Sequence, residues 1–189
     1  MAPIDRRTVL RAALAAVPAI TLEETDQTDP PKDPPKTKRV PAGQDLAGKE
    51  RKVFGTLPIT CKVSAQETHG DLLIVEQNNA QKGGPPRHLH LRQEEWFYVV
   101  RSEYLVEIDG VEYRLGPGDS VLAPRNIPHT WAYVGKGKGT LLVTFQPAGQ
   151  MEAFFTEATK LTGLPPQTEL AALFTAHEMQ LTGPPLEWE

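Results

Sequence analysis

The chain has 189 residues and a formal net charge of −4 at pH 7, with 20 Lys and Arg against 24 Asp and Glu. This length is enough for one well-buried domain and gives no reason to expect two. A negative balance without a basic stripe argues against nucleic acid as a partner. No stretch approaches the roughly 20 apolar residues of a membrane-spanning helix, so we expect no stable membrane insertion after processing.

The first 22 residues differ in kind from the rest of the chain. Arg6 and Arg7 precede a short Ala/Leu/Val run that ends near Ala19. This segment (1–22) resembles a twin-arginine export signal, which predicts a periplasmic or extracytoplasmic location. The alternative is a short amphipathic or disordered arm, which would leave the protein in the cytoplasm.

Residues 23–51 are rich in proline and charge and hold almost no large apolar side chains. Such a composition cannot bury enough surface to order itself, so it predicts a disordered, semi-extended linker.

Residues 52–150 contain short apolar runs of period two, separated by Gly, Pro and Asn. Asp109 and Gly110 form a two-residue loop between two such runs, which predicts a tight hairpin. Many short strands at near-regular spacing indicate an all-β sandwich or barrel. Cys61, the single cysteine, lies in such a run and is expected to be a buried structural thiol. The expected strands are residues 59–63, 71–76, 95–100, 104–108, 111–115, 120–123, 129–134 and 140–145.

Residues 151–189 change to the period of a helix, with a break at Gly163 and the prolines that follow. Two helices packed on the barrel are therefore expected, with the aromatic stripe as ordinary core and His177 as a packed or surface residue. The periodic positions are Met151, Phe154, Phe155 and Ala158 in the first helix, and Leu170, Leu173, Phe174 and His177 in the second.

Three of the five histidines fall in two short segments that also carry carboxylates. On a strand, side chains two apart share a face, so His88 and His90 can direct both imidazoles inward. Glu94 and Glu95 follow across a short turn, and only one of these neighbours can point the same way. With His129, such a set suits Mn, Fe, Co, Ni, Cu or Zn. The alternative is a group of polar residues on a half-buried sheet, and His69 is expected to be a solvated turn residue.

These segments resemble the two motifs of the cupin superfamily, G-x5-H-x-H-x3,4-E-x6-G and G-x5-P-x-G-x2-H-x3-N. His88, His90 and Glu95 fit the first motif. Gly118, Pro124 and His129 fit the second.

The departures from the motifs fall at turn or wall positions. The first glycine is displaced to Gly83 or Gly84, Ser102 replaces the last glycine of the first motif, Asn126 replaces the inner glycine of the second, and Tyr133 replaces its final Asn. They leave the ligand positions intact.

The resemblance covers about residues 54–147 and is greatest to single-domain cupins of the quercetin 2,3-dioxygenase-like group. It implies a small cupin-type β-barrel, a double-stranded β-helix or jelly roll, with a short C-terminal helical tail. It also implies one divalent transition metal held by His88, His90, Glu95 and His129, and it favours Glu95 over Glu94.

A substrate pocket is expected beside the metal. If Glu95 and His129 point inward, then Phe97, Val99, Trp131 and Tyr133 share their faces and would line it. An aromatic wall suits a planar or apolar organic ligand. Ordinary barrel filling is the alternative, most of all for Phe97 and Val99.

The leading hypothesis is a metal-dependent oxidoreductase, a dioxygenase that acts with O2 on an aromatic or enolisable small molecule. Glu95 would also be the catalytic base. The alternatives are a non-catalytic module that binds or senses a small ligand, and a metal-dependent sugar isomerase or epimerase. The identity of the metal and the formation of a homodimer are left open.

Overall fold

The computed structural model describes residues 38–188. The predicted export signal and about half of the predicted linker, residues 23–37, lie outside the described residues.

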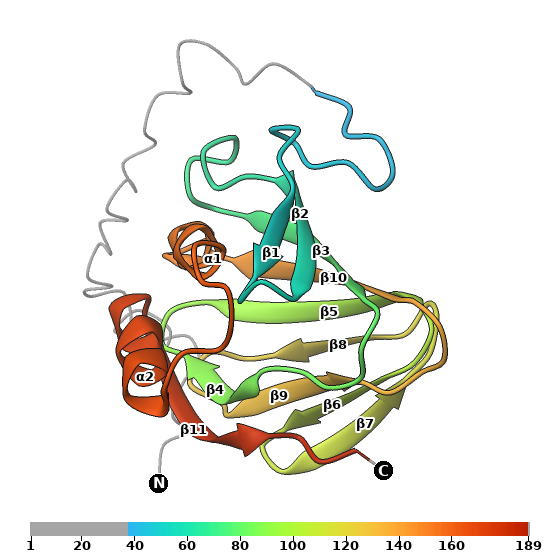
Figure 1. Ribbon diagram of the computed structural model, residues 1–189, viewed down its shortest axis with the longest axis vertical. Coiled ribbons are helices and arrows are strands. Elements are labelled where there is room, and N and C mark those ends of the chain that lie inside the picture. The colour runs from blue at the N-terminus through green and yellow to red at the C-terminus, as the bar shows by residue number, and fades with distance from the viewer. Residues whose placement is uncertain (1–37, 189) are drawn as a thin grey trace, which may run out of the picture. The chain divides into compact units, whose positions relative to one another are not determined.

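The described chain folds into two antiparallel β-sheets that face each other, which confirms the predicted all-β fold (Figure 1). One sheet has the strand order β1-β2-β3-β10-β5-β8, and the other has the order β11-β4-β9-β6-β7. The strands are β1 (Arg51–Val53), β2 (Leu57–Val63), β3 (Leu73–Asn79), β4 (Pro86–His90), β5 (Glu94–Arg101), β6 (Tyr104–Ile108), β7 (Val111–Leu115), β8 (Ser120–Ala123), β9 (His129–Tyr133), β10 (Gly139–Gln146) and β11 (Met179–Pro185).

Period-two patterns place alternate side chains of each sheet in a shared core. In β5, the inward residues Phe97 and Val99 are fully buried. The β6–β7 hairpin closes on Asp109 and Gly110, both at positive φ (52° and 76°), as the two-residue loop requires. Cys61 is buried on β2, as predicted.

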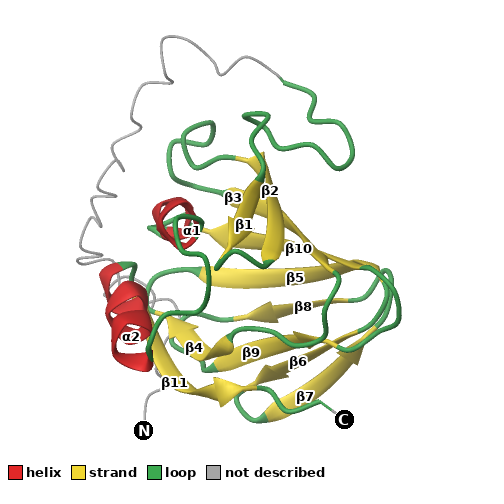
Figure 2. Ribbon diagram, viewed as in Figure 1, coloured by secondary structure: helices red, strands yellow, loops and turns green. Residues whose placement is uncertain are grey.

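Two helices lie at one end of the sheets (Figure 2). They are α1 (Met151–Ala158) and α2 (Gln167–Ala176), which confirms both helical patterns. Each turns its aromatic residues to the core, Phe154 and Phe155 from α1 and Phe174 from α2. His177 follows α2 directly and packs its ring against Phe154. Within residues 38–188, neither helix has the length and apolar character needed to cross a membrane.

The helical tail expected through residue 189 ends earlier than predicted. Residues 179–185 form β11, which pairs with β4 so that Met179 faces His90 and Leu181 faces His88. Pairing with β11 satisfies the backbone groups along the free edge of β4, a long-range need that local periodicity does not register. Gly183 and the prolines after it hide the strand in the sequence.

The predicted linker also ends earlier, because residues from 38 onward belong to the same compact unit as the sheets. Asp45 is buried, and its Oδ2 accepts a hydrogen bond of 2.8 Å from the backbone N–H of Cys61. Its Oδ1 accepts another of 2.9 Å from Ala47 N–H, and Arg51 Nε lies 3.3 Å from Oδ2. One buried carboxylate thus fastens a segment that has too few apolar side chains to be recognised from composition.

Candidate metal centre

Three strands bring the four predicted ligand residues together. His88 and His90 lie on β4, Glu95 on β5, and His129 begins β9, where it pairs directly with His88. One ligand-type atom from each residue lies within 4.8 Å of the others. All four side chains are buried, with His90 fully enclosed and His88 the most exposed at 6%.

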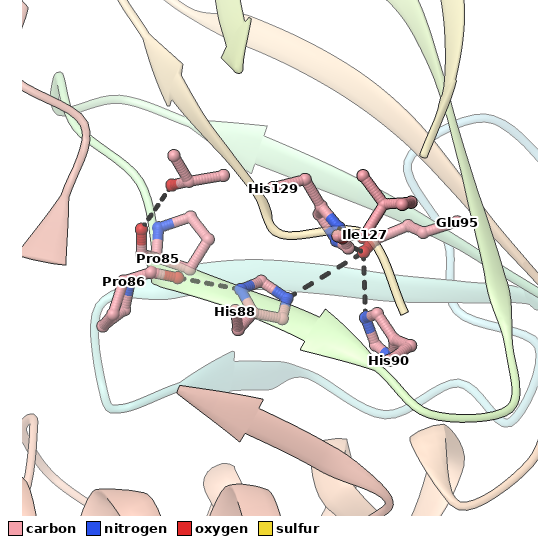
Figure 3. A network of polar contacts seen from close by, with 8 residues as sticks. Pro85, Pro86, His88, His90, Glu95, Ile127 and His129 are labelled. Atoms are coloured by element: carbon pink, nitrogen blue, oxygen red, sulfur yellow. Dashed lines mark hydrogen bonds and ion pairs between the residues drawn. The ribbon is translucent and has the colours of Figure 1, made fainter. Parts of the chain in front are cut away.

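The three imidazoles turn their Nε2 atoms toward one carboxylate oxygen, as Figure 3 shows. Oε2 of Glu95 lies 2.9 Å from His129 Nε2, 3.0 Å from His90 Nε2 and 4.0 Å from His88 Nε2.

Backbone carbonyls determine which ring nitrogen carries the proton. Nδ1 of His88 lies 2.8 Å from the carbonyl oxygen of Pro86, and Nδ1 of His129 lies 2.9 Å from that of Ile127. Because a carbonyl oxygen can only accept, both Nδ1 atoms must donate. In a neutral ring the inward Nε2 then carries a lone pair, which is the form that binds a metal.

Burial and the interactions among the four side chains set the charge states of the group. Burial raises the pKa of Glu95, but hydrogen bonds from His129 and His90 outweigh burial and hold this pKa well below its usual range. Burial lowers the pKa of His129, yet its hydrogen bond to Glu95 and the charge of that carboxylate raise it overall. Burial and the neighbouring His129 and His90 lower the pKa of His88 to about 3.

This donor set fits a divalent transition metal. Neutral Nε2 atoms and an ionised carboxylate all present lone pairs, so they repel one another unless a cation or a proton lies between them. Two ligands at about 2.1 Å from one metal, at right angles, are about 3.0 Å apart. The separations of 2.9 and 3.0 Å between Glu95 and two of the histidines match that spacing.

Glu94 points away from this group, as strand alternation requires. It forms a two-pronged ion pair with Arg125, in which Nη2 lies 2.6 Å from Oε2. The hydrogen bond from Arg125 lowers the pKa of the Glu94 carboxyl, despite the opposing effect of desolvation. His69, also set aside as a ligand, lies in an exposed turn.

A cavity of about 480 Å³ opens beside the group, and His88, His90 and Glu95 form part of its wall. This volume lies in the usual range for small-molecule sites. Most of the remaining wall is apolar, with the large side chains Leu57, Trp131, Phe145, Met151, Phe154, Phe155, Phe174 and Met179.

The predicted pocket wall was largely wrong. Trp131 lines the cavity, but Phe97, Val99 and Tyr133 do not. These three are at most 1% exposed, because the half of the sandwich that they occupy is filled by core packing. Tyr133 satisfies its hydroxyl by donating to the carbonyl oxygen of Gly137 at 3.1 Å.

The true wall comes from strands β3 and β10, which lie in the same sheet as β5, and from the helical tail. Phe145 lies on β10 directly opposite Glu95, and Phe154 and Phe174 come from the two helices. The helical stripe was visible in the sequence. The helical period predicts that these aromatic side chains are buried, but it does not show that some of them line a cavity.

The fold and the four-residue site are those of a small β-sandwich with a candidate metal centre. Residues 70–145 match the family model for the cupin domain, and this segment of the chain is a cupin domain. Among curated proteins, none matches the chain.

Several solved structures are similar in fold. KdgF from Halomonas sp. is 24% identical, with 52% of this chain and 86% of that chain covered and a TM-score of 0.45. An RmlC-like cupin from Shewanella frigidimarina is 27% identical, with 61% and 96% covered and a TM-score of 0.49. A recombinant oxalate oxidase in complex with glycolate is 23% identical, with 57% and 62% covered and a TM-score of 0.44. Likenesses at this level do not distinguish one activity from another.

Proposed function

We propose that this protein is a metal-dependent oxidoreductase, a dioxygenase that acts on an aromatic or enolisable small molecule. His88, His90, Glu95 and His129 would hold one divalent transition metal. The observation that supports this proposal is the convergence of four buried lone-pair donors, three of which line an apolar cavity.

The bound metal would supply coordination positions, beyond those taken by four protein ligands, at which a substrate oxygen and O2 can be held together. The residues of the cavity wall would bind the substrate and keep water out. Phe145, Phe154 and Phe174 form a wall that favours a flat apolar ligand and excludes water.

Glu95 is the residue placed to accept a proton from an enolic hydroxyl in the cavity. Its low pKa in the metal-free protein depends on hydrogen bonds from His90 and His129. Those bonds need protons on the two Nε2 atoms, and a bound metal would displace these protons. A bound cation would itself favour the ionised carboxylate, so Glu95 would act in the loaded protein as a proton acceptor.

A sugar isomerase or epimerase is less well supported by the cavity. Anionic sugars call for several basic side chains. Along the described part of the wall, Lys82 is the one Lys or Arg residue. A non-catalytic binding module would use the same cavity and is separated from the dioxygenase by experiment.

The test is O2 consumption by protein reconstituted in turn with Mn, Fe, Co, Ni and Cu, with a flavonol as substrate. We expect uptake above background with at least one metal, and its loss in Glu95→Gln. Glu94→Gln is the matched control and should keep turnover, since Glu94 faces Arg125 outside the site. If the flavonol binds but no metal supports O2 uptake, the dioxygenase proposal fails and the binding module takes its place.

A further inference from the structure

One polar side chain in the cavity wall has no partner for its carbonyl oxygen. Gln77 lies on β3 with its side chain inward, and it is only 4% exposed. Its Oε1 is buried without a hydrogen bond. Its neighbours across the sheet are Ile59 and Leu141, both buried and apolar. A buried amide oxygen without a partner is destabilising, so its presence calls for an explanation.

The rest of the cavity gives Gln77 a special position. Apart from the histidines, the charged residues on the described wall are Glu95 and Lys82. Glu95 belongs to the metal group, and Lys82 Nζ is engaged 5.2 Å above the ring of Trp188. Asn79, two residues along β3, also lines the cavity, and its Oδ1 accepts a hydrogen bond of 2.9 Å from Tyr104. The polar groups of the sheets that can contact a ligand in the cavity are thus concentrated at two places. One is the group of four metal-ligand residues, and the other is the part of β3 around Gln77.

Strand register gives the separation of these two places. On β10, Phe145 pairs with Glu95, and Leu141, four residues earlier, pairs with Gln77. At about 3.3 Å per residue, the backbone at Gln77 is roughly 13 Å along the strands from the backbone at Glu95. A ligand that contacts both places must be longer than a single ring.

We propose that Gln77 is a second anchor for the ligand, accepting a hydrogen bond from a hydroxyl at the end remote from the metal. The ligand class is an elongated, uncharged and mostly apolar molecule with one metal-binding end and one hydroxyl end. This inference rests on the proposed function, because it takes the metal group as the first anchor.

The experiment compares two probes on zinc-loaded protein, since zinc has no redox chemistry to consume them. The probes are unsubstituted flavonol and its derivative with one added hydroxyl at the para position of the pendant phenyl ring. Both carry the same metal-binding end. Affinity is measured by fluorescence titration, and zinc content by atomic emission.

We expect wild type to bind the hydroxylated probe about fivefold to tenfold more tightly, as one buried hydrogen bond allows. Gln77→Leu should abolish this preference while zinc content stays the same. Gln77→Met keeps the length of the side chain without its acceptor oxygen and should also abolish the preference, which covers the case in which Gln77→Leu folds poorly. Gln81→Leu is the matched control, because Gln81 lies on the exposed rim of the same cavity.

The outcomes separate this inference from the proposed function. A preference that survives in Gln77→Leu, or that wild type lacks, overturns the second anchor and leaves the metal site standing. Failure of zinc-loaded wild type to bind either probe overturns the second anchor together with the aromatic ligand. Absence of zinc from wild type would overturn the proposed function itself.

Discussion

Glu95→Gln is the substitution that tests the metal centre most directly, because it removes the carboxylate of the group and keeps its shape. The amide of Gln can donate N–H to the Nε2 lone pairs of His90 and His129, which lie 3.0 and 2.9 Å from Oε2 in the wild type. We therefore expect the metal-free variant to fold with a stability close to that of metal-free wild type. The difference should appear only when metal is added.

The expected size follows from linkage between binding and folding. Free zinc at 100 times its dissociation constant stabilises a protein by about 2.7 kcal/mol. For a domain of this size, each kcal/mol corresponds to about 2–4 °C in melting temperature, so zinc should raise the wild-type value by about 5–11 °C. If loss of the ligand weakens binding about 100-fold, the same zinc concentration stabilises the variant by only about 0.4 kcal/mol, or about 1–2 °C.

The assay is thermal unfolding followed by circular dichroism, with and without zinc, on wild type, Glu95→Gln and Glu94→Gln. Glu94→Gln should retain the full zinc effect, because its carboxylate pairs with Arg125 outside the group. A Glu95→Gln variant that keeps the whole zinc-induced shift would refute the assignment of Glu95 as a ligand. Equal loss in both variants would point to net charge rather than coordination.

Three further predictions concern protons and the edges of the fold. The hydrogen bond to Glu95 and the charge of its carboxylate outweigh burial and raise the pKa of His129 above 6.5. Zinc uptake near pH 6.5 should therefore release a proton from His129. That release should decline as pH rises through the raised pKa, and calorimetry in buffers of different ionisation enthalpy would show it. Burial, with the nearby Glu152 charge, raises the pKa of the Cys61 thiol from 9.0 to about 12. The native thiol should resist a disulfide reagent at pH 8 and react once unfolded in urea, and stability should fall as pH rises from about 9 toward 12, because only the unfolded chain ionises there. Asp45→Ala should cost about 3 kcal/mol in urea unfolding, because two hydrogen bonds to a carboxylate are lost. A chain beginning at Thr37 should melt like the full chain, whereas one beginning at Lys49 should be destabilised about as much as Asp45→Ala; equal melting of the two truncated chains would contradict the role of Asp45.

Local chemistry made much of the fold predictable. The strands Tyr104–Ile108 and Val111–Leu115 were expected with the bounds that the structure has, because the Asp109–Gly110 turn permits only one register. The grouping of His88, His90, Glu95 and His129 was also foreseen, since strand alternation and motif spacing both depend on short-range geometry.

The cavity wall was not predictable in the same way. Its residues come from β3, β10 and the two helices, and their meeting depends on how the two sheets are stacked. Gln77 was overlooked, although the inward series Leu73, Val75, Gln77 contains the signal: a polar residue at a core position of a period-two strand. Asp45 was missed because composition does not register one well-placed carboxylate.

The pairing of β11 with β4 has a consequence for how the protein is made. His88 and His90 lie on a strand whose outer edge is completed only by residues 179–185, much later in the chain. During synthesis one edge of β4 therefore stays unpaired until residues 179–185 have emerged from the ribosome. Metal loading is then expected to follow the pairing of β11 with β4, and weakened pairing along β11 should lower the metal content of newly made protein even when every ligand is intact.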